Sequence, residues 1–358
     1  MAGEGVVVGM SGGIDSSAAA SMLSEQGYRV IGVTLRLYCY ARPEAAPRPC
    51  CNAALLRRAR QLCARLGIEH HVIDAEAEFH ETVVRNFIDE YRAGRTPNPC
   101  IVCNEKVKFP VLARIADWLG CERIATGHYA RLVKDARGKV FLAAASDEKK
   151  DQSYFLYRVP VNILNRTIFP LGDMSKETVK RRAAKGGYRH EGQRESQDVC
   201  FVPDGNVKKF LRGELGRRAG DVLDREGNLL GKHEGVHLYT IGQRKGLGIA
   251  GGAPLYVSEI DSRRNRIVLA AKEDVFHAGA LCGSLKLRSS DLEATLKARI
   301  RYRRPLADIK GVERSDSLLA VRFRQSQWAV TPGQSLVLYE GDIVMGGGII
   351  EKALTDTS

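Results

Sequence analysis

A glycine turn between an apolar strand and a helix start constrains this chain most. The apolar run Val6 to Val8 leads into Gly9-Met10-Ser11-Gly12-Gly13-Ile14-Asp15-Ser16-Ser17, and an alanine-rich segment follows. The unpaired N–H groups of such a turn and the positive end of the helix dipole converge on an anion. The pattern therefore predicts a phosphate-binding strand–loop–helix unit. The alternative is an ordinary strand-to-helix turn, which does not need these hydroxyls beside an acid.

The loop disfavours two common nucleotide folds. No Gly-Lys-Ser/Thr follows the glycines, and their spacing does not give G-x-G-x-x-G. The loop resembles the SGGxDS signature of the pyrophosphate-loop ATPases, which cleave ATP between the α- and β-phosphates and adenylate a carbonyl or carboxylate oxygen. The resemblance implies that Ser11, Ser16 and Ser17 hold the leaving pyrophosphate, and that Asp15 holds Mg²⁺, which prefers oxygen ligands. The implied ATP-binding residues of the loop are Gly9, Met10, Ser11, Gly12, Gly13, Ile14, Asp15 and Ser16.

Length and composition narrow the class of protein. A chain of 358 residues with 44% hydrophobic and 27% charged residues is typical of a soluble protein of two or three domains. It lacks a membrane-length apolar run and the layout of a secretion signal, so we expect a cytoplasmic protein that is not bound to a membrane. The net charge of +13 favours a polyanionic partner such as nucleic acid, although small anionic ligands are the alternative. Nine cysteines in such a chain favour thiol chemistry or a metal site over a disulfide scaffold.

The first 130 residues alternate short β-rich runs with helical patterns, which predicts an α/β fold with a parallel sheet and helices on both faces. Ligands bind beyond the carboxyl ends of the strands in such sheets, where Ser11, Leu35 and Gly127 would gather. The predicted strands are Val6 to Gly9, Arg29 to Leu35, His70 to Asp74 and Arg123 to Gly127. The predicted helices are Ser16 to Gln26, Ala53 to Leu66, Glu78 to Ala93 and Glu105 to Leu119.

The pattern changes to short alternating runs punctuated by glycine and proline after about residue 200, as in hairpins and small barrels. We expect a nucleotide-binding and catalytic domain at 1–202, a small β-rich linking domain at 203–275 and a C-terminal β-barrel at 276–358. The runs that carry this prediction are Leu255 to Asp261, Asn265 to Ala270, Leu318 to Phe323 and Ser335 to Tyr339.

Two thiols stand out by their surroundings. The Pro97-Asn98-Pro99 turn leads to Cys103, and a helix starting just after it, with Asn104 as its cap, would lower the pKa of that thiol through the helix dipole. Cys100 and Cys103 form C-x-x-C, a spacing found in metal sites, redox pairs and plain cores. Cys200 lies beside Phe201, where its local pattern favours an inert core residue. Cys50-Cys51 could cover the nucleotide, and the remaining cysteines are interpreted as filler: Cys39, Cys63, Cys121 and Cys282.

Two basic segments are candidates for RNA contact. The alternation from Lys297 to Arg303 predicts a strand that buries Ala298, Ile300 and Tyr302 and displays four cations, a phosphate-binding stripe. A solvated barrel strand is the alternative. A second basic patch has helical spacing, and solubility explains it nearly as well: Lys176, Lys180, Arg181, Arg182 and Lys185.

Seven separated motifs resemble the bacterial tRNA-specific 2-thiouridylases over nearly the whole chain. That resemblance implies an ATP-dependent transferase with an adenine nucleotide alpha hydrolase-like first domain, which makes 2-thiouridine at the wobble position of tRNA and receives sulfur from a donor protein or persulfide carrier. The motifs are Ser11 to Ser17, Gly94 to Asn104, Gly127 to Arg131, Lys150 to Leu156, Ser196 to Phe201, Gly242 to Gly248 and Thr331 to Gln334.

The same resemblance implies roles for individual residues. Cys200 carries a persulfide and Cys103 is the partner nucleophile. The positions that match tRNA contacts in the family are His128, Lys150, Asp151, Gln152 and Gln334. We add Arg301 and Tyr302 from the basic strand, and the stiff turn Pro97, Asn98 and Pro99, where an extruded base would land.

One departure from the family leaves the sulfur route open. Family members often carry aspartate at the position of Cys100, so Cys100, Cys103 and Cys200 could instead hold three irons of a [4Fe-4S] cluster. We favour the persulfide, because C-x-x-C spacing alone does not establish a cluster. Two other functions compete: a pyrophosphate-loop ligase acting on a small carboxylate, and a nucleotide-gated RNA-binding protein without chemistry.

Overall fold

The computed structural model describes residues 3–38, 53–185, 199–202, 205–249, 253–289 and 295–355. Backbone contacts divide the chain into two compact units, each assembled from separate stretches. Unit 1 comprises residues 1–84, 100–205 and 342–344, and unit 2 comprises residues 85–99, 206–341 and 345–358. None of the helices in the described ranges has the length and apolar character needed to cross a membrane.

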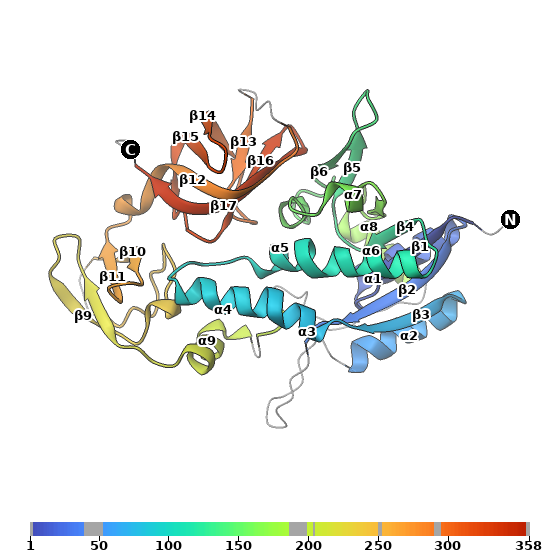
Figure 1. The fold of residues 1–358 in the computed structure, drawn as a ribbon, viewed down its shortest axis with the longest axis horizontal. Coiled ribbons are helices and arrows are strands. Elements are labelled where there is room, and N and C mark those ends of the chain that lie inside the picture. The colour runs from blue at the N-terminus through green and yellow to red at the C-terminus, as the bar shows by residue number, and fades with distance from the viewer. Residues whose placement is uncertain are drawn as a thin grey trace. The chain divides into compact units, whose positions relative to one another are not determined.

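Unit 1 is built on a five-stranded sheet in the order β3-β2-β1-β4-β7, in which all neighbours run parallel. Strands β1 to β4 of this sheet are labelled in Figure 1. Because Val6, Val7 and Val8 are fully buried, β1 is the central strand that anchors the unit. The strands are β1 (Gly5–Gly9), β2 (Arg29–Arg36), β3 (Glu69–Asp74), β4 (Arg123–Thr126) and β7 (Thr167–Ile168).

Helices cover both faces of this sheet, as the alternating pattern predicts. Val6 and Val8 pack in one core cluster with Leu23 of α1 (Ile14–Glu25) and Leu62 of α2 (Ala53–Leu66). A side chain at Gly9, on the opposite face of the same strand, would meet Leu112 of α6 (Phe109–Trp118) at 3.1 Å. The predicted fold class for this part is confirmed.

The helical segment that carries Cys103 begins earlier than predicted. It runs through α5 (Pro99–Cys103), the π-helical turn η2 (Asn104–Lys108) and α6. The prediction of a helix that begins after Cys103 with Asn104 as its cap is therefore wrong. Proline at a first helical position needs no partner for its missing N–H, which favours a start at Pro99. Asn104 is buried and its side-chain amide donates to the Phe155 carbonyl at 3.1 Å.

The remaining helix prediction of the first half, Glu78 to Ala93, is also interrupted. The chain forms α3 (Glu76–Phe79), the π-helical turn η1 (His80–Val84) and α4 (Arg85–Arg92). The rest of unit 1 consists of β5 (Arg131–Lys134), β6 (Val140–Ala143), η3 (Ser153–Phe155), α7 (Val161–Leu164) and α8 (Lys176–Lys185). Helix α8 packs on α1, where Val179 joins Ala18, Met22 and Tyr129 in a buried cluster.

Unit 2 contains a four-stranded sheet and a closed barrel. The sheet has the order β10-β11-β8-β9, and α4 packs on α9 through Phe87 and Phe210, whose ring centroids are 6.2 Å apart. The barrel follows β12-β15-β14-β13-β16-β17 and closes through β12 and β17. Its elements and those of the sheet are α9 (Val207–Leu215), β8 (Gly220–Leu223), β9 (Leu229–His233), η5 (Val236–Leu238), β10 (Tyr256–Asp261), β11 (Arg266–Ala270), η6 (Glu273–Val275), β12 (Phe276–Leu287), β13 (Lys297–Arg299), β14 (Ala307–Arg314), β15 (Leu319–Trp328), β16 (Ser335–Glu340) and β17 (Ile343–Leu354).

The predicted basic strand is shorter than the alternation suggests. Strand β13 ends at Arg299, and the Arg304 N–H donates to the Arg301 carbonyl at 3.1 Å to close a turn. Pro305 cannot donate to a sheet ladder, so the chain leaves the strand before it. Ala298 and Ile300 are buried as predicted, whereas Tyr302 is only half-buried. The prediction that one strand displays four cations on a single face is therefore wrong. Of the two cations within β13, Lys297 pairs with Asp308 at 3.0 Å, and Arg299 stacks on the Tyr339 ring.

Candidate active site

The glycine loop folds into a compact turn between β1 and α1. Gly13 caps the helix, and the Ser16 hydroxyl accepts from the Ser11 N–H at 3.1 Å and donates to the Gly13 carbonyl at 3.2 Å. Gly12 has φ +72°, and a Cβ there would lie 2.2 Å from the Leu55 carbonyl oxygen. The Ser16 hydroxyl thus braces the loop, while Ser11 is exposed at its surface.

Gly127 brings the end of β4 against the start of α1. A Cβ on Gly127 would lie 2.7 Å from both the carbonyl carbon of Asp15 and the nitrogen of Ser16. Leu35 is the next-to-last residue of the neighbouring strand β2, on the other side of β1, and the buried Met10 donates its N–H to the Val33 carbonyl at 2.7 Å. The carboxyl ends of β1, β2 and β4 therefore gather around the loop, which is where open parallel sheets bind ligands.

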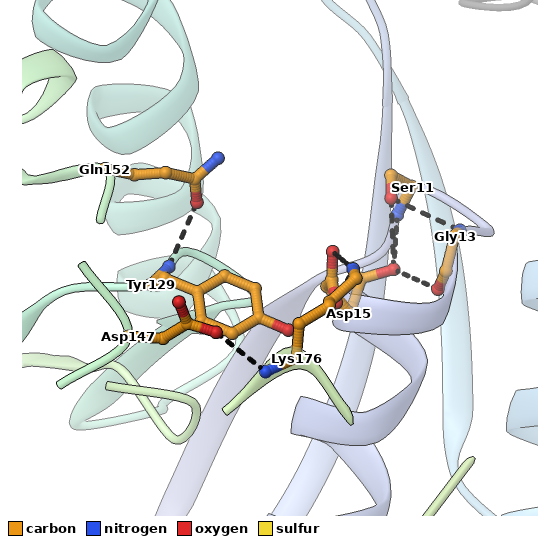
Figure 2. Close-up of polar contacts among 8 residues, drawn as sticks. Ser11, Gly13, Asp15, Tyr129, Asp147, Gln152 and Lys176 are labelled. Carbon is orange, nitrogen blue, oxygen red and sulfur yellow. Dashed lines mark hydrogen bonds and ion pairs between the residues drawn. The ribbon is translucent and has the colours of Figure 1, made fainter. Parts of the chain in front are cut away.

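A lysine at the start of α8, 161 positions from Asp15 in the sequence, contacts the glycine loop. The Lys176 ammonium lies 2.6 and 2.7 Å from the two carboxylate oxygens of Asp15, and the Tyr129 hydroxyl donates to the same carboxylate at 2.9 Å (Figure 2). The side chain of Lys176 is only 8% exposed, whereas that of Asp15 is 34% exposed. The inclusion of Lys176 in a basic surface patch is therefore wrong, because its buried cation pairs with Asp15 of the glycine loop.

The thiol of Cys103 is buried within the helical segment. Burial raises its pKa to about 12, and the ammonium and backbone N–H of Lys108 act in the opposite direction. The expected lowering of this pKa by a helix dipole is thus wrong for the structure as it stands. Cys103 lies several residues inside the helix, where the dipole effect has faded.

Cys200 lies close to the other two thiols. Its neighbour Phe201 is buried and packs edge-on against Phe79 of α3, with ring centroids 5.7 Å apart, so the segment 199–202 is anchored in unit 1. Burial has the largest effect on the pKa of Cys103, followed by Lys108. An ionised Cys200, and to a smaller extent an ionised Cys100, would raise this pKa further, and such an effect acts only between groups that lie near one another. Cys200 itself is half-buried and Cys100 is exposed.

The thiols do not form a metal-binding group. Within the residues that the structure describes, no set of three His, Cys, Asp or Glu side chains lies close enough together to hold a metal ion. The donor set expected for a cluster is therefore not assembled by Cys100, Cys103 and Cys200. Cys39, Cys50 and Cys51 lie outside the described residues, so their interpretations stay predictions. The other cysteines interpreted as filler are buried: Cys63, Cys121 and Cys282.

The candidate tRNA contacts of unit 1 are tied into the fold. The His128 ring stacks on Phe109 and contacts the Thr126 hydroxyl through Nδ1 at 2.8 Å; burial, followed by the charge of Lys108, holds its pKa well below the usual range, so the imidazole is neutral. The buried Asp151 carboxylate accepts from Ala145 N–H and from the N–H and hydroxyl of Ser153.

Lys150 and Gln152, the neighbours of Asp151 in the chain, differ in exposure and in their partners. The side-chain oxygen of Gln152 accepts from the Tyr129 N–H at 3.0 Å, so Gln152 positions the residue that contacts Asp15. Lys150 is half-buried. Both Asp151 and Gln152 therefore have structural partners, and their contacts with RNA stay predictions.

In unit 2 the structure brings two predicted segments together. The side-chain amide of Gln334 donates to the Thr96 carbonyl at 2.7 Å and to the Pro97 carbonyl at 3.3 Å, and the Thr96 N–H donates to the Pro332 carbonyl at 2.9 Å. Gln334 thus holds the start of the Pro97-Asn98-Pro99 turn. Arg301 donates to the Thr331 hydroxyl at 2.7 Å, close to the same segment.

Comparison with known proteins decides the family. A tRNA-specific 2-thiouridylase MnmA from Halothermothrix orenii is 42% identical over 97% of this chain and 99% of its own length, and one from Geobacter metallireducens is 41% identical over 98% of each chain. This chain belongs to the tRNA-specific 2-thiouridylase family. The predicted resemblance is confirmed.

Family profiles match consecutive parts of the chain and agree with its fold. They are described as a tRNA methyl transferase HUP domain at 4–204, a tRNA methyl transferase PRC-barrel domain at 208–271 and an aminomethyltransferase β-barrel domain at 282–350. Among solved structures, a complex of a 4-thiouridine synthetase with RNA and bound ATP is 16% identical with a TM-score of 0.35, over 59% of this chain and 50% of that one, a likeness too distant to bear on function.

Sequence reasoning missed three residues of this family member's site. Lys176 and the Tyr129 hydroxyl complete the surroundings of Asp15, and Lys108 acts on both Cys103 and His128. No local pattern marks Lys176 as a loop residue, because its partner lies 161 positions away. Lys108 closes the π-helical turn η2, and such turns are frequent at functional sites, but the sequence pattern does not distinguish them from α-helix.

Proposed function

We propose that this protein is an ATP-dependent transferase that makes 2-thiouridine at the wobble position of tRNA and releases AMP and pyrophosphate. The observation that carries the proposal is one compact unit that holds Cys103, Cys200 and the glycine loop at the start of α1, and in which an ionised Cys200 would raise the pKa of Cys103. The name 2-thiouridylase on full-length relatives supports sulfur transfer over the methyl transfer in two profile descriptions.

ATP would activate the base before sulfur arrives. The C2 carbonyl oxygen of uridine attacks the α-phosphate of ATP, the bond to the β-phosphate breaks, and pyrophosphate leaves into the loop at Ser11 to Ser17. The loop N–H groups and the amino end of α1 suit an anionic leaving group. The Asp15 carboxylate fits Mg²⁺, which would neutralise phosphate charge there.

Sulfur would then come from Cys200. The terminal sulfur of a Cys200 persulfide attacks C2 and AMP departs with the former carbonyl oxygen. The Cys103 thiolate next attacks the Cys200 sulfur, so the sulfur bound to C2 is released as 2-thiouridine and a Cys103–Cys200 disulfide forms. An external dithiol reduces that disulfide, and a sulfur-donor protein or persulfide carrier reloads Cys200. The high pKa of Cys103 in the resting structure requires that substrate or donor binding help to deprotonate it.

We further propose a division of labour along the chain, with 1–202 binding nucleotide and carrying the thiols, 203–275 linking, and 276–358 contacting tRNA. The excess of 55 Lys and Arg over 42 Asp and Glu supports binding of a polyanion. The tRNA contacts that we propose for unit 1 are His128, Lys150, Asp151 and Gln152, and those for unit 2 are Pro97, Asn98, Pro99, Arg301, Tyr302 and Gln334. We place the reaction in the cytoplasm.

The test combines chemistry and binding. Purified protein is incubated with ATP, Mg²⁺, a sulfur source and unmodified tRNA, and the RNA is resolved on a mercury-containing gel that retards thiolated species. We expect Cys200→Ser and Cys103→Ser to lose thiolation by at least about 100-fold, with tRNA affinity retained. Cys121→Ser, a change at another buried cysteine, should remain active. Thiolation that survives Cys200→Ser would refute the persulfide assignment.

The same preparations separate the rival functions. Iron and acid-labile sulfide in anaerobically purified protein would favour the cluster route through Cys100, Cys103 and Cys200. AMP formed without tRNA in the presence of a small carboxylate would favour a different ligase. Binding of ATP and tRNA with no AMP formed would favour an RNA-binding protein without chemistry.

A further inference from the structure

Lys176 is a buried cation whose partner is open to solvent. Its ammonium bonds both oxygens of Asp15 at 2.6 and 2.7 Å, its side chain is 8% exposed, and a third of the Asp15 side chain remains accessible. A buried ammonium needs an anionic partner, since the loss of its hydration is otherwise not compensated. An exposed carboxylate oxygen has no such need, because water can solvate it.

Contacts with Asp147 and Tyr129 fix the position of Lys176. Lys176 is the first residue of α8, and its backbone N–H donates to the Asp147 carboxylate at 3.0 Å (Figure 2). Its ammonium also lies 5.5 Å from the centre of the Tyr129 ring. Tyr129 in turn is fixed by Gln152, which bonds both its N–H and its carbonyl. The cation is therefore preorganised beside the glycine loop.

The position of Asp15 makes this pair unlike a structural ion pair. Asp15 lies in the first turn of α1, the turn whose N–H groups would bind an anion. An unneutralised carboxylate there would repel a polyphosphate. Positive charge must accompany any phosphate that binds this loop, and Lys176 is already within hydrogen-bond distance of the carboxylate.

We propose that Lys176 is a polyphosphate-binding residue whose ammonium Asp15 holds in reserve until nucleotide arrives. The inference rests on the proposed function, in which ATP binds at this loop. On binding of ATP, the Lys176 ammonium would exchange its carboxylate partner for β- or γ-phosphate oxygens, and the released Asp15 carboxylate would hold Mg²⁺. The leaving pyrophosphate therefore keeps a cation throughout the adenylation step.

The proposal predicts a selective loss of phosphate affinity. Isothermal titration with α,β-methylene-ATP, pyrophosphate and AMP, each with Mg²⁺, compares wild type with Lys176→Met. Loss of one charge-assisted contact should weaken the analogue and pyrophosphate by about tenfold or more. AMP, which lacks the β- and γ-phosphates, should change by less than about threefold. Lys176→Arg, which keeps the charge, should recover part of the loss.

Lys180→Met is the matched control, because Lys180 lies one turn along the same helix and is exposed. It should bind all three ligands as wild type does. If Lys176→Met does not fold, the double variant Lys176→Met with Asp15→Asn leaves no lone charge and is compared with Asp15→Asn alone, with the same selective loss expected.

Equal weakening of AMP and the analogue, or an unchanged affinity for both, would overturn the proposal and leave Lys176 as a structural partner of Asp15. A wild-type protein that does not bind α,β-methylene-ATP would instead refute the proposed function. The two failures are therefore distinguishable.

Discussion

Two ion pairs in unit 1 differ in how much water reaches them. Arg158 and Glu105, two residues beyond Cys103, are 10% and 8% exposed, and the guanidinium bonds both carboxylate oxygens at 2.6 and 3.2 Å. In the pair of Lys176 with Asp15 only the cation is enclosed. A pair closed at both ends has little room to change partners, whereas an open carboxylate can accept a new one. The difference separates a structural pair from one suited to ligand exchange.

The choice of cation agrees with this difference. The planar guanidinium of Arg158 matches a carboxylate with two parallel bonds, which suits a permanent contact. The ammonium of Lys176 is a compact charge whose three donors can be redirected to other oxygens. Desolvation lowers the pKa of Arg158, but the bonds to Glu105 and the interactions with Tyr157 together outweigh it, so the pKa is raised overall.

The largest effect should come from breaking the closed pair. Arg158→Met leaves the buried Glu105 carboxylate without its cation, which we expect to cost about 3–5 kcal/mol of unfolding free energy in a denaturant titration. Arg182→Met removes the cation of an exposed pair with Glu25 and should cost at most about 1 kcal/mol. Losses of similar size in both variants would show that the burial of the pair near Cys103 does not matter.

A substitution that displaces Asp15, the open member of the second pair, should weaken ligand binding more than it lowers stability. Gly127→Ala places a methyl group 2.7 Å from the backbone of Asp15 and Ser16, so the start of α1 must shift. We expect α,β-methylene-ATP affinity to fall by about tenfold. Gly213→Ala in α9 meets no atom within 4 Å and is the control that should bind normally. Normal affinity in Gly127→Ala would mean that the loop does not bind nucleotide where we propose.

The smallest effect concerns the thiol beside the closed pair. Because Arg158 is matched by Glu105, the cation that lowers the pKa of Cys103 is Lys108, acting against burial. Lys108→Met should raise that pKa further, so iodoacetamide labelling of Cys103 at a fixed pH should slow by about threefold and its pH profile should move to higher pH. Peptide mass spectrometry measures the labelling, and the exposed Lys106→Met is the control. An unchanged pH profile would mean that burial alone determines the pKa of Cys103.

Local patterns predicted the parts of the fold that local physics determines. The loop between β1 and α1, and helix α2 from Ala53 to Leu66, follow the expected residues because apolar period, glycine and flanking hydroxyls act within a few positions. The predicted length of β13 was wrong because the alternation continues to Arg303, whereas the strand ends at Arg299 and the chain then turns.

The parts of the site that could not be predicted depend on distant pairs. Nothing near Lys176 indicates that its helix packs on α1 and directs its cation to Asp15. Cys200 looked like a core residue by its neighbours, and its closeness to Cys103 follows from the anchoring of Phe201 on α3. Tertiary packing, which no local pattern specifies, determines both relationships.

The interleaved make-up of unit 2 affects how the protein is made. The stretch 85–99 belongs to a unit whose other partners include Gln334 and, through Arg95, Glu351, which lies 256 positions further along the chain. During synthesis that stretch, with the proline turn that precedes Cys100, must wait until Gln334 and Glu351 have been translated before these native partners exist. A chain that stops before Gln334 would therefore leave this early segment without these contacts.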